Sequence, residues 1–202
     1  TCFLIISGGI GFLVMVDVVK CRFRFRKFTL HSKVVVTTTA FLLAAGALLL
    51  KFTDPLSWLT AFFLSVSART AGFATLDLGT LSNAGLFTIL ILMFIGASPG
   101  STGGGIKTTT VAVLALTVWS VIRGDADVQL ARRRVPPGLI RRALAIVSIS
   151  LAMALGGTML LTLLEGDGQP FLDMMFEAFS AMATVGVSSA GTPNLSAGSK
   201  TV

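Results

Sequence analysis

Long apolar stretches without a charged side chain constrain this 202-residue chain more than any other feature. Residues 34–50 and 143–164 are the clearest, and each approaches the roughly 20 apolar residues that cross the hydrocarbon core of a bilayer. Only 12% of all residues are charged, whereas a soluble domain carries about 25%. Because helices satisfy their own backbone hydrogen bonds in lipid, the sequence predicts an all-α membrane protein.

The basic residues are concentrated in two loops, which predicts the orientation of the chain. Twelve of the 16 Lys and Arg residues lie in the loops 20–33 and 123–142. The connections on the opposite side carry acidic residues: Asp54, Asp77, Glu165 and Asp167. By the positive-inside rule the basic loops face the cytoplasm, where they can also contact anionic membrane lipids. Topology thus explains the net charge of +7, and the sequence predicts no nucleic-acid partner.

Two further apolar segments are too short to cross a bilayer. Residues 56–66 follow a turn at Asp54 and Pro55, and residues 171–183 follow an acidic turn. A helix of this length can enter the membrane from the outside and turn back, as re-entrant pore loops do. Each segment leads into a loop with the pattern Thr-x-Gly, and we name these the first loop (residues 67–73) and the second loop (residues 183–188).

The two halves of the chain form a sparse internal repeat at an offset of 114 residues. The offset superimposes the following pairs: Phe62 and Phe176, Thr70 and Thr184, Gly72 and Gly186, Leu81 and Leu195, Ser82 and Ser196. Each unit reads as a span, a short helix, a Thr-x-Gly loop and another span. Internal repeats of this kind are common in transport proteins, so the sequence predicts helix–pore loop–helix units.

The two Thr-x-Gly loops have the chemistry of a cation site. Rings of backbone carbonyls can replace the hydration shell of a potassium ion, and glycine adopts the dihedral angles that direct carbonyls towards an axis. The C-terminal end of each short helix would point its partial negative charge to the same place. Asp173 and Glu177 would add negative charge near the outer mouth. The alternative is that both loops are ordinary glycine turns between packed helices.

A glycine-rich segment, residues 98–107, interrupts the apolar region between residues 84 and 122. It resembles a nucleotide-binding P-loop, but Lys107 comes one residue late, no strand precedes it, and it falls within a membrane span. Three successive glycines form a helix poorly, which predicts irregular backbone inside the membrane. Lys107 either places a positive charge near an ion path or extends to the cytoplasmic interface, and the sequence leaves both possibilities open.

Enzyme chemistry finds little support in the sequence. Cys2 and Cys21 have no metal-binding or redox spacing, and His31 lies in a basic loop without a ligand cluster. No nucleophile–base pair stands out, so we expect no enzyme and no covalently bound cofactor. The alternatives to a potassium pore are another cation channel and a secondary transporter with broken helices.

The motifs resemble those of the Trk/Ktr/HKT potassium transporter superfamily, and most closely the ion-conducting membrane subunit of Ktr-type systems. The most specific part is the run Ser-Pro-Gly-Ser-Thr-Gly-Gly-Gly-Ile-Lys of the glycine-rich segment. Both Thr-x-Gly loops are also similar, as is the run from Gly8 to Phe12 together with Asp17. The resemblance covers nearly the whole chain.

The resemblance implies four helix–pore loop–helix units around one pore, of which this chain holds a part. The implied division is the last helix of unit two (1–19), a cytoplasmic basic loop (20–33), unit three with its broken second helix (34–122), a second cytoplasmic basic loop (123–142), and the first helix and pore loop of unit four (143–202). The implied filter residues are Thr70, Ala71, Gly72, Phe73, Thr184, Val185, Gly186 and Val187. The implied gating-loop residues are Ser98, Gly100, Gly103, Gly104, Gly105 and Lys107.

The same resemblance implies the ions and the partners. Potassium would bind at the filter residues, and sodium is a further candidate as a transported or coupled ion. Family members form homodimers in the inner membrane of bacteria. Ktr-type members also bind a cytosolic ring of nucleotide-binding regulatory subunits, so a nucleotide would sit on the partner alone. The chain starts within an apolar segment and ends in a polar one, which predicts a piece of a longer protein whose other units complete the filter.

Overall fold

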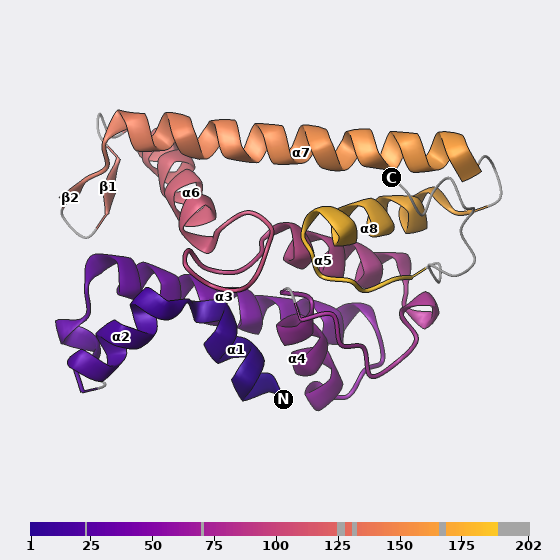
Figure 1. Cartoon of the computed structure of the whole chain (residues 1–202), viewed down its shortest axis with the longest axis horizontal. Helices are drawn as coiled ribbons and strands as arrows, with labels where there is room; N and C mark the ends of the chain where they lie inside the picture. The colour runs from indigo at the N-terminus through magenta and orange to yellow at the C-terminus, as the bar shows by residue number, and fades with distance from the viewer. Residues whose placement is uncertain (23, 70, 125–127, 131–132, 166–168, 190–202) are drawn as a thin grey trace.

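The computed structural model describes residues 1–22, 24–69, 71–124, 128–130, 133–165 and 169–189, and in this part the chain is almost entirely helical (Figure 1). The helices in chain order are α1 (Cys2–Ile10), α2 (Phe12–Lys20), α3 (Leu30–Thr53), α4 (Trp58–Ser67), α5 (Asn83–Phe94), α6 (Thr108–Arg123), α7 (Pro137–Glu165) and α8 (Phe171–Met182). Two short 3₁₀ helices cover Phe25–Lys27 and Leu78–Thr80. The strands β1 (Gln129–Leu130) and β2 (Arg133–Arg134) form a small antiparallel hairpin.

Two helices are long and apolar enough to cross a membrane, namely α3 and α7. They contain 24 and 29 residues. At 1.5 Å per residue their lengths are about 36 and 44 Å, against roughly 30 Å of hydrocarbon. The predicted spans 34–50 and 143–164 lie within them. The helices α4 and α8 have only 10 and 12 residues, so the prediction of two short helices is also confirmed.

Residues 1–19, expected to form the last helix of unit two, are divided between α1 and α2, which are bent by 95° at a break. Gly11 lies at the break with a φ of 92°, a conformation that residues with a Cβ rarely adopt. The glycine-rich segment contacts the bend: the Phe12 N–H donates to the Gly100 carbonyl at 3.0 Å, and the Ser98 N–H donates to the Gly9 carbonyl at 3.0 Å. The prediction of one helix was wrong because local hydropathy carries no information about this distant contact.

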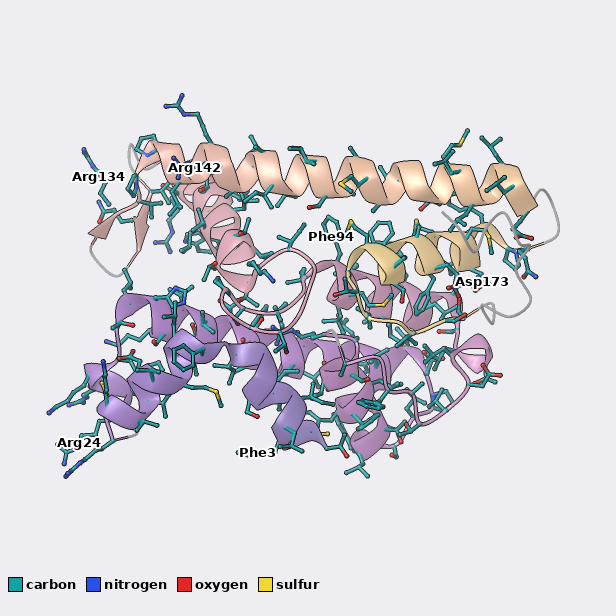
Figure 2. The ribbon with its side chains drawn as sticks, in the orientation of Figure 1. Phe3, Arg24, Phe94, Arg134, Arg142 and Asp173 are labelled. Atoms are coloured by element: carbon teal, nitrogen blue, oxygen red, sulfur yellow. The ribbon has the colours of Figure 1, made fainter. Side chains whose placement is uncertain are left out.

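The second basic loop is more structured than predicted. Residues 137–142 form the first turns of α7, which begins at Pro137, and proline suits the first helical position because its missing N–H is not needed there. The hairpin before it pairs Gln129 with Arg134. In Figure 2, Arg24, Arg134 and Arg142 lie towards one end of the long axis and Asp173 towards the other. The two basic loops thus lie towards the same end of the molecule.

The buried core lies around α4, α5 and α8. Phe176 and Met93 are fully buried in it, and the rings of Phe94 and Phe179 pack at 5.5 Å between centroids. The long helix α3 packs on α4, and α7 packs on α8, so each short helix leans on the span that precedes it. Away from its contact with α8, α7 exposes apolar side chains. Met153, in the middle of the helix, is 65% exposed. Such an apolar outer surface suits lipid or further protein rather than water.

A buried carboxylate fixes the position of α5 relative to α3. Asp54 follows the last residue of α3 and accepts hydrogen bonds from the Ser82 N–H at 2.8 Å and the Ser82 hydroxyl at 3.1 Å. The same hydroxyl accepts from the Gly85 N–H and thereby caps α5. A Cβ at Gly85 would overlap the Asp54 carboxylate. These contacts join the end of α3 to the start of α5, and α4 and the first loop lie in the chain between these two points.

We expect Asp54→Ala to lower the stability of the protein by about 1 kcal/mol, because it removes the buried acceptor of two part-buried hydrogen bonds from Ser82. The measurement is the thermal unfolding midpoint of the purified protein in detergent. Asp77→Ala is the matched control, since Asp77 is exposed and caps only a local turn at the Gly79 N–H. Equal shifts for the two variants would contradict the role given to Asp54.

Candidate functional site

Both Thr-x-Gly loops follow directly on a short helix and have the same backbone conformation at the glycine. Gly72 and Gly186 have φ values of 71° and 80°, in the left-handed region that glycine occupies without strain. Thr184 is also left-handed, with a φ of 56°, whereas Thr70 lies outside the described residues. Both predicted loops therefore have a positive φ at the glycine, a backbone conformation that favours glycine over other residues.

The structure brings the two loops into direct contact, although more than 100 residues separate them in sequence. A Cβ at Gly72 would overlap the carbonyl oxygen of Val185, so the two backbones touch at this point. Further along, a Cβ at Gly79 would lie 3.3 Å from the carbonyl oxygen of Ser189. Gly72 of the first loop therefore lies directly against Val185 of the second loop.

Several carbonyl oxygens in the described part of these loops receive no hydrogen bond. They are the carbonyl oxygens of Ala71, Gly72, Thr184, Val185 and Gly186. Buried backbone carbonyls are nearly always paired with protein or water, and Val185 is a buried residue of this group. Several free carbonyls on two touching loops can bind a cation or ordered water.

Each loop is closed by a serine that the sequence pattern did not reveal. The Ser67 hydroxyl accepts from the Phe73 N–H at 2.9 Å and donates to the Phe73 carbonyl. The Ser180 hydroxyl accepts from the Val187 N–H at 3.0 Å and donates to the Val187 carbonyl at 2.6 Å. Both serines are buried on the short helices. Phe73 and Val187, two of the predicted filter residues, are thus bound to their own helices.

The two serines are 113 residues apart, and so are the first residues of α4 and α8, Trp58 and Phe171. The helices therefore repeat at an offset of 113, and the chain between the serine and the threonine is one residue longer in the second unit. The predicted pairing of Phe62 with Phe176 is wrong in register, because Phe62 is 39% exposed while Phe176 is fully buried. A search for repeated serines at both offsets would have found the closure.

The acidic residues of α8 contact the end of the second loop. The Ser189 hydroxyl donates to the Asp173 carboxylate at 2.7 Å, and the Ser188 hydroxyl donates to the Glu177 carboxylate. These contacts place both carboxylates beside the second loop and hold the chain that leaves it.

The glycine-rich segment forms a defined loop between α5 and α6, at the centre of the view in Figure 1. The predicted break in the helix is confirmed. The Ala97 N–H donates to the Gly104 carbonyl at 3.3 Å, and the Ile106 N–H donates to the Phe94 carbonyl at 3.1 Å. The ammonium group of Lys107 donates to the Gly103 carbonyl at 2.6 Å, within the same loop. This bond holds the charge of Lys107 against the segment.

The glycine-rich segment touches the second Thr-x-Gly loop, and the residues just before the segment contact the first loop. A Cβ at Gly104 would overlap the Thr184 hydroxyl and lie 2.6 Å from the Ala183 carbonyl oxygen, so only glycine fits against the second loop. On the other side, buried Arg69 donates from Nη2 to the Gly96 carbonyl at 3.2 Å. The first loop is thereby tied to the residues that lead into the segment.

Two long helices, two short helices that end in touching carbonyl-rich loops, and a helix broken by glycine define a class of membrane protein with pore loops. The chain matches the family model of the TrkH cation transport proteins over residues 1–202. The chain therefore belongs to the TrkH cation transport protein family. This confirms the resemblance found in the motifs, and it agrees with the expectation of a transporter rather than an enzyme.

Individual relatives support the assignment. The chain is 38% identical to the Ktr system potassium uptake protein B of Bacillus subtilis over 99% of its own length, and 35% identical to the potassium/sodium uptake protein NtpJ of Enterococcus hirae over 95%. It covers 47% and 45% of those proteins, so it spans slightly less than half of each. The crystal structure of the potassium transporter TrkH from Vibrio parahaemolyticus matches 91% of the chain with a TM-score of 0.67 at 18% identity, and 41% of that chain is covered.

We expect Gly72→Ala to destabilise the protein more than Gly186→Ala. Both substitutions force alanine into a left-handed conformation, at a cost of roughly 1–2 kcal/mol each. Only the Cβ at position 72 also overlaps a backbone carbonyl, whereas nothing lies within 4 Å of a Cβ at position 186. Thermal unfolding midpoints in detergent measure the difference. If Gly186→Ala proved the more harmful variant, the contact between the two loops would be wrong.

Proposed function

We propose that the protein takes up potassium ions across the bacterial inner membrane, through a selectivity filter of backbone carbonyls on the two Thr-x-Gly loops. The observation that carries this proposal is the group of carbonyl oxygens without hydrogen-bond partners on two loops that touch. Such oxygens can replace the hydration shell of a potassium ion. The proposed filter residues are Thr70, Ala71, Gly72, Phe73, Thr184, Val185, Gly186 and Val187. Relatives named as potassium and potassium/sodium uptake proteins support potassium as the ion and keep sodium as a candidate.

The hydrogen bonding of the carbonyls at the helix breaks favours this pore over a secondary carrier with broken helices. In such carriers, unwound backbone carbonyls at the breaks coordinate the ion. Here three of the carbonyls at the breaks have protein donors: Gly9 binds the Ser98 N–H, Gly100 binds the Phe12 N–H, and Gly104 binds the Ala97 N–H. The described residues of the Thr-x-Gly loops instead carry consecutive free carbonyls on two segments that touch, which supports the filter as the ion site.

The glycine-rich segment is the proposed gate. The residues assigned to it are Ser98, Gly100, Gly103, Gly104, Gly105 and Lys107. Its contact with the second loop at Thr184 supports this role, because a segment in that place obstructs the space beside the filter. The bond between Lys107 and the Gly103 carbonyl keeps a positive charge on the segment, where it would repel a cation.

The proposed assembly is a homodimer whose basic loops 20–33 and 123–142 face the cytoplasm and meet a ring of nucleotide-binding regulatory subunits. Relatives named as components of a Ktr system support a protein that works with further subunits. The positions of Arg24, Arg134 and Arg142 towards one end of the molecule support a common face for that contact (Figure 2). The remaining pore loops would come from parts of the full-length protein that correspond to the uncovered half of the relatives.

The proposal predicts that the complete gene product restores growth at low potassium to a bacterial strain without its own uptake systems, when a regulatory subunit is co-expressed. Gly186→Ser should abolish this rescue while the protein remains in the membrane, because serine is strained at a φ of 80° and moves the carbonyls. Growth by wild-type protein that Gly186→Ser leaves intact would refute a filter at this loop. No growth with well-expressed wild-type protein would favour another cation.

A second prediction concerns the gate. Removal of Gly103, Gly104 and Gly105 should raise potassium flux, because it withdraws the segment that touches the second loop. The measurement is potassium uptake into proteoliposomes that contain the complete gene product. Substitution of Gly138, at which a Cβ would meet nothing within 4 Å, is the control and should leave the flux unchanged. Unaltered or reduced flux after the deletion, with folded protein present, would count against a gate.

A further inference from the structure

We infer that Ser67 and Ser180 are positioning residues that set the outer limit of the filter, an inference that rests on the proposed function. Each serine binds the residue after the filter glycine, Phe73 or Val187, to the short helix behind it. We name this pair of contacts the serine latch. The latch makes the carbonyls of Gly72 and Gly186 the last ones that face the ion. Phe73 and Val187, the outermost of the proposed filter residues, then hold the ends of the loops and supply no ion-facing carbonyl.

The first step is the geometry of the latch. Each hydroxyl uses its acceptor and its donor on the same residue: it accepts from the N–H and donates to the carbonyl. A hydroxyl offers one hydrogen and two lone pairs, so this arrangement uses its donor completely. A carbonyl that accepts this hydrogen is directed towards its own helix. The latched residue can then neither rotate its peptide groups freely nor slide along the helix.

The second step is the contrast with the carbonyls that come before the latch. In the described part of the two loops, the oxygens of Gly72 and Gly186 receive no hydrogen bond, whereas the oxygens of the next residues do. The change from free to bonded carbonyl occurs at the same place in both units. A filter that ends at the glycine accounts for this boundary.

The third step is that the latch is kept although the serine and the latched residue are spaced differently in the two units. Ser67 reaches a residue six positions ahead, whereas Ser180 reaches one seven positions ahead. The extra residue of the second unit is therefore accommodated between the serine and the glycine. Preservation of the hydrogen bonds rather than of the spacing indicates that the exit of the loop must be fixed.

The fourth step is that these serines do not follow the usual behaviour of hydroxyls on helices. A helical Ser or Thr normally donates to a carbonyl one turn back, as Thr117 does to Val113 and Thr158 does to Ala154. Ser67 and Ser180 bond forward to the loop instead. Another buried serine of α4, Ser65, bonds to the Leu43 carbonyl of α3 at 3.0 Å and takes no part in the loop.

Ser65 provides the matched control for the experiment. The variants are Ser67→Ala, Ser180→Ala and Ser65→Ala in the complete gene product, each checked for its amount in the membrane. Ion competition for uptake into proteoliposomes gives the discrimination between potassium and sodium. Loss of the latch should reduce this discrimination by about fivefold or more, the factor expected from one lost hydrogen bond, while Ser65→Ala keeps the wild-type ratio.

A second measurement separates filter geometry from general stability. Potassium that binds the folded filter should raise the thermal unfolding midpoint relative to sodium. Ser67→Ala and Ser180→Ala should lose this potassium-specific shift, whereas Ser65→Ala should lower the midpoint in both salts and keep the shift. If an alanine variant does not accumulate, Ser67→Cys or Ser180→Cys, with a much weaker hydrogen bond, replaces it in both measurements.

The outcomes separate the latch from the proposed function. Wild-type discrimination and a wild-type potassium shift in both latch variants, with both lost in Gly186→Ser, would overturn the latch and leave the filter intact. Retention of both in Gly186→Ser as well would overturn the filter itself. Equal loss in Ser65→Ala and Ser67→Ala would also overturn the latch, since it would show a general effect of removing a buried hydroxyl.

Discussion

A backbone that leaves its helical form inside a membrane must find a partner for each N–H and carbonyl group, because lipid supplies none. The glycine-rich segment meets this constraint through the chain itself, with hydrogen bonds to the end of α5 and to the bend between α1 and α2. Close backbone approach makes these bonds possible, as where Gly96 lies against Gly104. The bend at Gly11 belongs to the same arrangement, so the constraint shapes the helices as well as the segment between them.

In the described part of the Thr-x-Gly loops, the N–H donors largely have partners, but the carbonyl acceptors largely do not. Their donors are largely paired: the Ala71 N–H binds the Ser67 carbonyl, the Val185 N–H binds the Ser180 carbonyl, and the N–H groups of Phe73 and Val187 bind serine hydroxyls. Their acceptors are largely free within the described residues. A site with occupied donors and available acceptors attracts a cation, whereas an anion site would show the reverse. Hydrogen-bond pairing, rather than side-chain charge, therefore defines the chemistry of these loops.

The features that the sequence predicted depend on neighbouring residues. The two spans, the two short helices and the break at residues 98–107 follow from hydropathy, helix length and glycine content within single segments. The missed features depend on contacts between distant segments. The bend at Gly11 depends on the hydrogen bond from the Phe12 N–H to the Gly100 carbonyl, and Arg69 donates a hydrogen bond to the Gly96 carbonyl. The sequence did not predict the latch, because the identical residues of the repeat align at an offset of 114, whereas the two serines align at an offset of 113.

The two units share the latch but differ in what surrounds it. The first loop is tied through Arg69 to the residues before the glycine-rich segment, while the second loop lies with Thr184 against Gly104 of that segment. A displacement of the segment must therefore alter the surroundings of Thr184 and, through Gly96, the contact of Arg69. The two loops also touch each other at Gly72 and Val185. A continuous series of contacts thus joins the two loops and the broken helix, and a displacement of any one of the three would alter its contacts with the others.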